Sequence, residues 1–437
     1  MFTERPTEEQ RHLHVKAHLK SAPLDVLPTS AMELIHHYEG QDLPAPMSTY
    51  TLLISSLFSR PSSVAKAQAW DMFMHMRYAA HPEPDQLLYS IMIRACASPI
   101  STKYSSEPER ALDLWRELTI DHKIMPSVGS YNAVILACAR SGTKTYVNEA
   151  FRLAKQMLDS HRDAFGNSAF RPDKKTFCAL LEGAKRIGDL GRARWILAEL
   201  VRGPERTSLE EVEDRASELD EEVMMHMFHA YASYKPPFLR SATKVVDGIP
   251  QPNEETQPVE RDTVSITEKE PAPSWTQLPP QSRQEVLREA QFLFSRILED
   301  TGHAAAGEES SPIAASVFKN VKLTPRLINS YLSIFYKHSD LETSRQEFWK
   351  NFEEFGVQRT LRSYVEALER CAHTRWELER DLALVFGKEL WDKWEAVEAA
   401  AGPDAPRHDA RLLERLHAAM IRLYAVYVGA YVSSTHI

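Results

Sequence analysis

The sequence predicts an all-α protein, a right-handed α-solenoid of stacked helix-turn-helix repeats with one disordered insertion. Apolar residues recur at three- and four-residue spacing along most of the 437 residues, whereas the alternating pattern of β-strands is hard to find. Ala, Leu, Glu, Arg and Met, which favour helices, come in blocks. One apolar pattern also returns at the interval of a single helical hairpin, which indicates a repeat protein.

One of the two repeated helices starts at an alanine, followed by apolar residues at positions +1, +3, +4 and +7. On a helix these offsets form one apolar stripe, with the small alanine where a neighbouring helix approaches closely. Arg194 and Gln291 break the +1 position in two of the copies. The leading alanines are Ala31, Ala69, Ala111, Ala150, Ala193 and Ala290. Such hairpins, stacked side by side, bury a continuous core between neighbours.

The other repeated helix precedes the stripe and opens with an aromatic residue. The leading aromatics are Tyr50, Tyr89, Tyr131, Phe177 and Tyr364. Three cysteines follow a leading tyrosine by seven residues, and we expect them to be small packing residues between helices: Cys96, Cys138 and Cys371. A proline followed by Asp or Ser ends one repeat and caps the next, at Pro84–Asp85, Pro126–Ser127 and Pro172–Asp173.

Composition divides the chain into four expected parts. Residues 1–28 form an N-terminal extension, partly disordered, and residues 29–235 form the N-terminal repeat array. Residues 236–282 contain nine prolines with Glu, Thr, Gln and Ser between them, the composition of a disordered insertion. We expect this insertion between the two helices of one repeat. Residues 283–437 form looser, degenerate helical repeats.

The net charge of −9 is unevenly distributed. Residues 47–203 hold 21 Lys and Arg against 15 Asp and Glu, a net charge of +6. Residues 204–312 hold 10 against 22, a net charge of −12. The best-patterned repeats are therefore basic. The four cysteines form no CxxC pair, which indicates a reducing compartment rather than a disulfide scaffold.

No common catalytic or metal-binding motif appears in the sequence. The histidines at 12, 14 and 18, and the pair His226 and His229, lack the partner ligands that a zinc site needs. We therefore expect no catalytic residue, no metal, no cofactor and no enzymatic activity. The apolar stretch at 416–432 carries Arg422 and is short for a bilayer, so we expect a buried helix and no membrane span.

The repeat pattern resembles the pentatricopeptide repeat family. The match is clearest at 128–173, which begins Val-Gly-Ser-Tyr-Asn and ends Arg-Pro-Asp. Residues 47–203 carry most of the resemblance, and the repeats after residue 313 are looser. Successive repeats of 39, 42 and 46 residues, at 47–85, 86–127 and 128–173, exceed the usual period near 35. In this they look similar to mitochondrial RNA-processing members of fungal and animal type.

The resemblance implies that each repeat reads one RNA base with two side chains. One side chain follows the leading aromatic, and the other is the last residue of the repeat. The implied pairs are Thr51 with Asp85, Ser90 with Ser127, Asn132 with Asp173, and Asn329 with Thr360. Asn132/Asp173 would favour uridine and Thr51/Asp85 guanine, whereas Cys178 and Val365 occupy the same position without reading a base. Cations for the phosphate backbone are expected at Arg140, Arg186 and Lys337.

The expected RNA-binding residues also allow purely structural interpretations. Asn132, Asp85 and Asp173 could serve as helix caps, and Arg140 and Arg186 as solvated surface charges. The expected function is a single-stranded RNA-binding adaptor in mitochondrial RNA processing, splicing, rRNA maturation or translation, located in the matrix. Its RNA would be a mitochondrial transcript or rRNA, with ribosomal or processing-complex proteins as further partners. The alternatives are a protein-binding scaffold of tetratricopeptide type and a structural subunit of the mitochondrial ribosome. Positive charge on the face that carries Thr51, Ser90 and Asn132 would favour RNA.

Overall fold

A computed structural model describes residues 5–100, 105–160, 162, 170–202, 219–237, 278–302, 317–374, 377–400 and 408–434. Within these ranges the secondary structure is helical, and no β-sheet forms. The chain divides into two compact units, Met1–Ile187 and Gly188–Ile437, which are described separately. None of the helices in these ranges is long and apolar enough to cross a bilayer.

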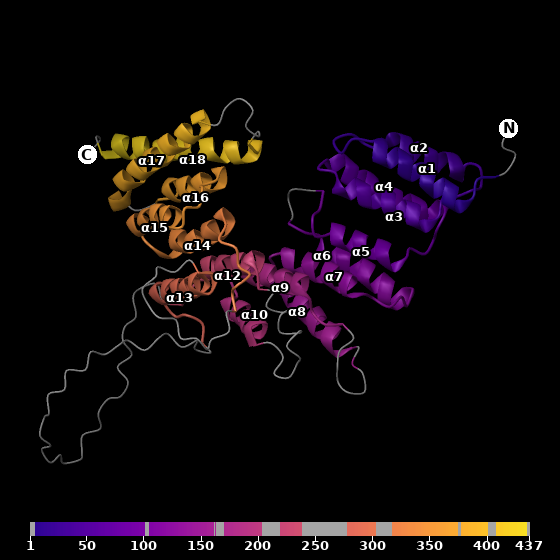
Figure 1. The fold of residues 1–437 in the computed structure, drawn as a ribbon, viewed down its shortest axis with the longest axis horizontal. Helices are drawn as coiled ribbons and strands as arrows, with labels where there is room; N and C mark the ends of the chain where they lie inside the picture. The colour runs from indigo at the N-terminus through magenta and orange to yellow at the C-terminus, as the bar shows by residue number, and fades with distance from the viewer. Residues whose placement is uncertain are drawn as a thin grey trace, which may run out of the picture. The chain divides into compact units, whose positions relative to one another are not determined.

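Unit 1, residues 1–187, is a stack of helical hairpins (Figure 1). Its hairpins are α1/α2 (Glu8–Ser21, Thr29–Glu39), α3/α4 (Met47–Ser59, Ser63–Ala79), α5/α6 (Gln86–Ala95, Pro108–Arg116) and α7/α8 (Val128–Arg140, Lys144–Asp159), followed by α9 (Lys174–Ile187). A π-helical turn, Glu117–Asp121, continues α6. The first helices α1, α3, α5, α7 and α9 pack against one another in chain order and form one layer. The second helix of each hairpin packs on that layer.

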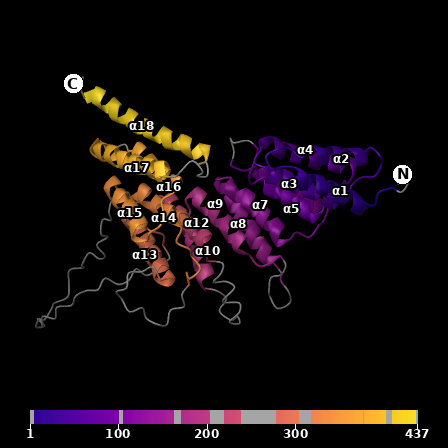
Figure 2. The ribbon, with the colours of Figure 1, turned by 45° about the horizontal axis from the view of Figure 1, so that its top comes forward.

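Unit 2 repeats this arrangement of packed helices (Figure 2). Its helices are α10 (Leu190–Arg202), α12 (Glu221–Ser233), α13 (Arg283–Thr301), α14 (Pro325–His338), α15 (Leu341–Glu354), α16 (Leu361–Ala372), the 3₁₀ turn Glu377–Glu379, α17 (Arg380–Ala400) and α18 (Ala410–Ser434). The helices α12, α14, α16 and α18 pack in order as the first layer, and α13, α15 and α17 pack on them. The all-α solenoid expected from the sequence is confirmed.

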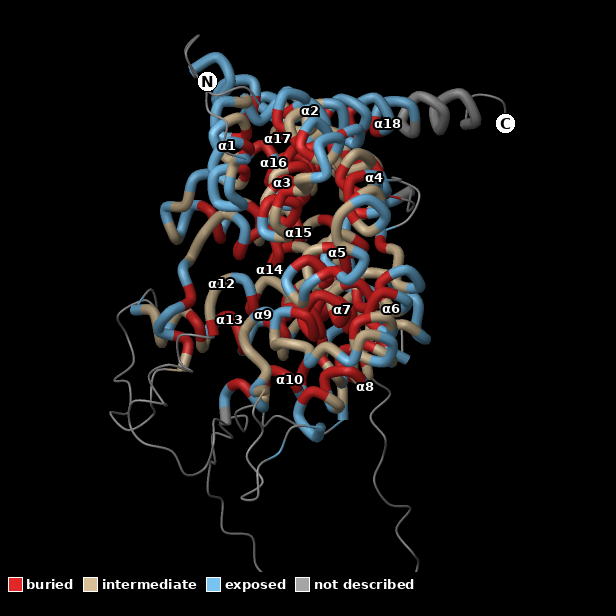
Figure 3. The backbone as a smooth tube through the Cα atoms, turned by 90° about the vertical axis from the view of Figure 1, so that its right-hand side faces the viewer, coloured by how far each residue is buried: buried red, intermediate tan, exposed pale blue. Residues whose placement is uncertain are grey.

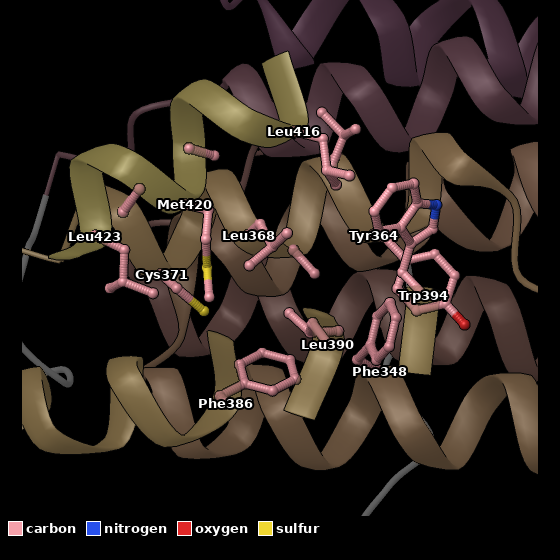
Figure 4. Packing of buried hydrophobic residues seen from close by; sticks show 14 of the residues in the cluster. Phe348, Tyr364, Leu368, Cys371, Phe386, Leu390, Trp394, Leu416, Met420 and Leu423 are labelled. Carbon is pink, nitrogen blue, oxygen red and sulfur yellow. The ribbon is translucent and has the colours of Figure 1, made fainter. Parts of the chain in front are cut away.

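The repeat signatures form the core. All six leading alanines are fully buried, and the leading tyrosines lie beneath the surface with them (Figure 3). All four cysteines are buried, and burial raises the pKa of Cys96, Cys138 and Cys371 to about 12, as expected for packing residues. In unit 2 one apolar cluster joins α14 to α18, and it includes Phe348 and Phe386 (Figure 4).

The structure describes residues at both boundaries of the expected N-terminal array. Residues 8–21, within the expected N-terminal extension, form α1, because Thr7 and Gln10 make a capping box and Val15 is buried against the next helices. Most of the expected insertion lies outside the described residues. Its last residues, 278–282, pack on the helices: Tyr234 donates a hydrogen bond to the carbonyl of Pro280 over 3.0 Å, and Ser282 caps α13.

Arg194, which interrupts an apolar stripe, has a structural role that the pattern does not show. It is only 7% exposed, and its Nε lies 2.8 Å from Glu289 Oε1. Tyr231 donates to the same oxygen over 2.7 Å, and Arg194 Nη1 donates to the carbonyl of Leu278 over 2.7 Å. A buried charge is tolerated when it is paired and hydrogen-bonded. Arg194 therefore ties α10 to α13 and holds the chain that leads into α13.

Candidate nucleic-acid interface

The expected base-reading residues occupy equivalent helical positions in unit 1. Each is the fifth residue of its helix: Thr51 in α3, Ser90 in α5 and Asn132 in α7. Because these helices pack in order, the three side chains form a line across the first layer, here called the polar row. The helix-capping residue of the next first-layer helix lies at the following junction, and it supplies the expected second reader.

The junction between α7 and α9 joins one expected pair directly. Asn132 Nδ2 donates to Asp173 Oδ1 over 2.9 Å. The Thr176 hydroxyl donates to Asn132 Oδ1 over 2.6 Å. Asn132 is 9% exposed, so these bonds form in a partly desolvated place, where each is stronger than at an open surface. Sequence residues 41 positions apart thus meet as one amide–carboxylate pair.

The same carboxylate caps α9. Asp173 Oδ1 accepts the backbone N–H of Thr176 over 2.9 Å, and the backbone N–H of Asp173 donates to Thr176 Oγ1 over 3.1 Å. This reciprocal bonding satisfies donors that the first turn of a helix leaves unpaired. The capping role and the pairing with Asn132 therefore coexist, because one oxygen accepts both, and Asp173 Oδ2 remains for a ligand.

The junction between α5 and α7 uses hydroxyls instead. Ser90 Oγ lies 2.7 Å from Ser130 Oγ, which lies 3.1 Å from Ser127 Oγ. Ser127 and Ser130 form the capping box of α7. Ser130 therefore bridges the expected pair Ser90 and Ser127, and the sequence analysis did not select it. Its place three residues after the cap is the signal that would have found it.

The first expected pair is not joined by a hydrogen bond between its two described side chains. Thr51 is 6% exposed, and its hydroxyl donates to the carbonyl of Met47 one helical turn earlier, over 3.1 Å. Asp85 is exposed and caps α5 by accepting the backbone N–H of Leu88 over 2.7 Å. Both groups thus satisfy backbone atoms of their own helices. The two side chains to which the family pattern assigns a guanine preference are therefore not held together as a pair before a ligand binds.

The two expected phosphate-binding arginines of unit 1 both have protein partners. Arg140 Nη1 donates to the carbonyl of Ala97 and to Ser98 Oγ, each over 3.1 Å, and so holds α7 against the end of α5. Arg186 Nε donates to Glu182 Oε1 over 2.6 Å. Burial alone would raise the pKa of Glu182, but Lys185 and Arg186 outweigh it and lower that pKa to about 2. Neither arginine is a bare surface charge.

Two further cations close to the expected reader residues, which the sequence did not single out, have no partner among the contacts that the structure describes. Arg94 is exposed and follows Ser90 by four residues, which places it on the same face of α5. Lys175 is exposed at the second position of α9, two residues after Asp173. Both adjoin the polar row. Their spacing from a reader residue is the signal that would have found them.

The positive charge of residues 47–203 is spread over both layers of unit 1. The first layer carries Arg94, Arg140, Lys174, Lys175, Lys185 and Arg186. The second layer carries Lys66, Arg77, Arg110, Arg116, Lys144, Arg152 and Lys155. Several second-layer arginines are engaged by carboxylates, as Arg152 is by Glu149 at 2.6 Å. Position alone therefore does not single out the face that carries the polar row.

The fourth expected pair, Asn329 with Thr360, lies in unit 2, and its hydrogen bonds differ from those of Asn132 and Asp173. Asn329 is the fifth residue of α14 and 5% exposed, and its Nδ2 has no hydrogen-bond partner in the described part of the chain. Thr360 forms a capping box with Ser363 at the start of α16, and their hydroxyls lie 3.1 Å apart. A small pocket beside Asn329 is lined by Met225, His229, Arg326, Ser330, Arg362 and Glu366. Lys337 is exposed at the end of α14.

Comparison with known proteins gives structural neighbours only. No family model matches the chain, and no curated protein matches it. Among solved structures, pentatricopeptide repeat protein PPR10 in complex with an 18-nt psaJ RNA element is 14% identical, with a TM-score of 0.40, over 98% of this chain and 53% of that one. The same protein from maize, in another crystal structure, is 17% identical, with a TM-score of 0.39, over 97% and 54%.

This chain resembles pentatricopeptide repeat proteins. It spans about half the length of the solved chains that it matches. Its own residues provide an amide–carboxylate pair between stacked helical hairpins, a neighbouring hydroxyl junction and two exposed cations. Such groups can exchange hydrogen bonds with the edge of a nucleobase and can attract phosphate. They do not include a nucleophilic side chain paired with a general base.

Proposed function

We propose that this protein binds single-stranded RNA along the polar row of unit 1, with the junction of Asn132 and Asp173 as its most selective position. The carrying observation is the 2.9 Å hydrogen bond between these side chains, which fixes both before any ligand arrives. A preformed pair loses little side-chain entropy on binding, so more of its hydrogen-bond energy reaches the complex.

The hydrogen-bonding capacity left at this junction suits uracil. An Asn amide has two N–H donors and two carbonyl lone pairs, and Asn132 uses one of each. Its second N–H can donate to a uracil carbonyl, while its carbonyl or Asp173 Oδ2 accepts the N3–H of the base. The neighbouring serines donate and accept equally well, so the Ser90 junction tolerates several bases.

In this proposal the affinity for RNA is moderate and depends only weakly on the salt concentration. Arg94 and Lys175 are the exposed cations beside the row, whereas Arg140 and Arg186 are engaged by the protein. Each phosphate that is neutralised releases counterions, so a few contacts give a shallow but measurable dependence of the binding constant on salt. Arg94→Ala should weaken binding to all sequences alike, because phosphate contacts carry no base information.

The test is competition binding of the full chain to single-stranded RNAs that differ at one base, at two salt concentrations. The wild type should prefer uridine, and Asn132→Ala/Asp173→Ala should lose that preference, by about tenfold for one well-placed base contact. Asn329→Ala/Thr360→Ala is the matched control from unit 2 and should leave the preference unchanged. Circular dichroism at the assay temperature confirms that each variant is folded.

Equal affinity of the wild type and the Asn132/Asp173 variant for every RNA would refute base reading at this junction. An absence of RNA binding at low salt would favour a protein-binding scaffold, for which the cations on both layers and the net charge of −9 are arguments. A mitochondrial transcript or rRNA as target, and a matrix location, rest on the family resemblance alone. Crosslinking and sequencing of bound RNA from cells, with imaging of the tagged full-length protein, tests both.

A further inference from the structure

A cluster of three metal-ligating side chains, none of which belongs to the polar row, lies between two hairpins of unit 1. His36 and Glu39 are three residues apart on α2, and His75 comes from α4. His36 Nδ1 lies 3.0 Å and His75 Nε2 lies 2.7 Å from Glu39 Oε2. The ligand atoms all lie within 4.8 Å of one another, and the two imidazole rings lie 4.7 Å apart edge to face.

We propose that His36, Glu39 and His75 bind one divalent transition-metal ion of the zinc type, with solvent completing its coordination. Two imidazoles and a carboxylate suit such ions, whereas Mg²⁺ and Ca²⁺ prefer ligand sets made of oxygen. Three protein ligands with one open position is an arrangement that zinc adopts. In zinc sites the ligand atoms lie about 2.0–2.2 Å from the ion, so tetrahedral coordination places them roughly 3.3 Å apart. Each of the two histidine nitrogens needs to move away from Glu39 Oε2 by a few tenths of an ångström.

The surroundings prepare the carboxylate for this role. Tyr50, which is fully buried, donates its hydroxyl to the other oxygen of Glu39 and leaves Oε2 directed at both histidines. Burial and the neighbouring Glu39 raise the pKa of Tyr50, so this donor keeps its proton. Burial raises the pKa of Glu39, but the hydrogen bonds from Tyr50 and the two histidines outweigh it and lower that pKa. Partners of this kind orient metal ligands and tune their basicity.

The cluster is accessible to an ion from solution. The side chains of His36 and His75 are 48% and 39% exposed, whereas that of Glu39 is 10% exposed. Both imidazoles donate to Glu39 in the metal-free geometry, so the nitrogen that faces Glu39 must give up its proton to the other ring nitrogen when the ion binds. The bound ion would join α2 to α4 and so fasten the first hairpin to the second.

Isothermal titration of the full-length protein with Zn²⁺ tests the site, with Mg²⁺ as the negative control. One zinc per chain is expected, with a rise of several degrees in the unfolding midpoint at saturating zinc. His36→Ala/His75→Ala should abolish the shift. His37→Ala is the matched control, since His37 is exposed on the same helix and bonds to Gln41 instead. It should retain the shift.

Co²⁺ supplies a readout that stability alone does not. Four-coordinate cobalt gives strong visible absorption, which is expected in the wild type and in His37→Ala and lost in His36→Ala/His75→Ala. Zinc affinity or a cobalt spectrum that is the same in the double variant as in the wild type would overturn the proposal, because other histidines would then be the ligands. Absence of zinc binding to the wild type at neutral pH would overturn it as well.

Discussion

The junctions α7–α9 and α14–α16 place the same residue at the same helical position with opposite results. Asn132 and Asn329 are each the fifth residue of a first-layer helix. Asn132 is held by Asp173 and Thr176, whereas Asn329 Nδ2 is buried without a partner in the part of the chain that the structure describes. The neighbouring helix makes the difference, because Asp173 reaches across the junction and the capping hydroxyls of Thr360 and Ser363 bond to each other.

The two junctions also treat a buried carboxylate differently. In α9, Glu182 is paired by two cations, Lys185 at 2.5 Å and Arg186 at 2.6 Å, and its pKa falls to about 2. In α16, burial dominates and raises the pKa of Glu366, although Arg362 lies 2.7 Å away and lowers it. Arg362 and Arg415 do not offset the desolvation of Glu366, to which Glu369 adds, whereas Lys185 and Arg186 outweigh that of Glu182. The comparison shows that the partner, rather than the position, decides whether a polar group stabilises a repeat.

Lowering the pH should have the largest effect, because it should change the stability of the two junctions in opposite directions. Because the folded pKa of Glu182 lies below its ordinary value of 4.5, its contribution is present above pH 4.5 and is lost as the pH falls towards 2, by roughly 3 kcal/mol. The contribution of Glu366 should depend on pH in the opposite way, because its raised pKa adds stability below pH 4.5 that is lost as the pH rises. Chemical denaturation of the wild type, Glu182→Gln and Glu366→Gln across this pH range measures both. A difference between wild type and Glu182→Gln that does not change with pH would contradict the assignment.

Removal of the capping side chain should cost more in α9 than in α16. Asp173→Ala removes two hydrogen bonds to a carboxylate, from Asn132 Nδ2 and from the backbone N–H of Thr176, and should destabilise α9 by about 3 kcal/mol. Thr360→Ala should destabilise α16 by about 1 kcal/mol. Hydrogen exchange resolved to peptides of each helix measures them separately. Equal effects would mean that the contact with Asn132 adds nothing to the cap.

Replacement of each asparagine by leucine, which has the same number of side-chain heavy atoms and the same branching, should have opposite effects at the two junctions. Asn132→Leu leaves the Thr176 hydroxyl and Asp173 with fewer partners and should cost about 2 kcal/mol. Asn329→Leu removes a buried amide that has an unpaired donor, so its cost should be close to zero or negative. Urea denaturation followed by hydrogen exchange checks both. A cost for Asn329→Leu that matches that of Asn132→Leu would indicate that Asn329 has a partner after all.

The smallest effect is expected when the capping carboxylate of the α7–α9 junction is introduced at the equivalent position of the α14–α16 junction. Thr360→Asp places a carboxylate at the cap of α16, where an acceptor is available to Asn329 Nδ2, and should stabilise α14–α16 by about 1 kcal/mol at neutral pH. Thr360→Asn is the control, since it retains the cap without the charge. A rise in the midpoint of unfolding for Asp above that for Asn supports the comparison, and a fall would show that repulsion from Glu366 dominates.

The sequence alone determined the repeat and its core. The alanine-led and aromatic-led helices, the buried cysteines and the capping residues at Asp85, Ser127 and Asp173 all follow from local spacing, because helix periodicity and capping depend on residues within one or two turns. The positions of the candidate readers follow in the same way. Two exposed cations beside them, Arg94 and Lys175, were equally visible in the spacing but require the polar row as a reference.

Only the tertiary structure decided which of these groups are engaged. Asn132 meets Asp173, and Arg194 meets Glu289, across more than forty and ninety residues, and no local pattern fixes such partners. The same holds for the cluster of His36, Glu39 and His75, since its third ligand comes from another hairpin. Hydrogen bonds and ion pairs act over a few ångströms, so their partners are known only when the helices are stacked. The repeat pattern follows from residues that are close together in the sequence, whereas the polar contacts form between side chains of different repeats.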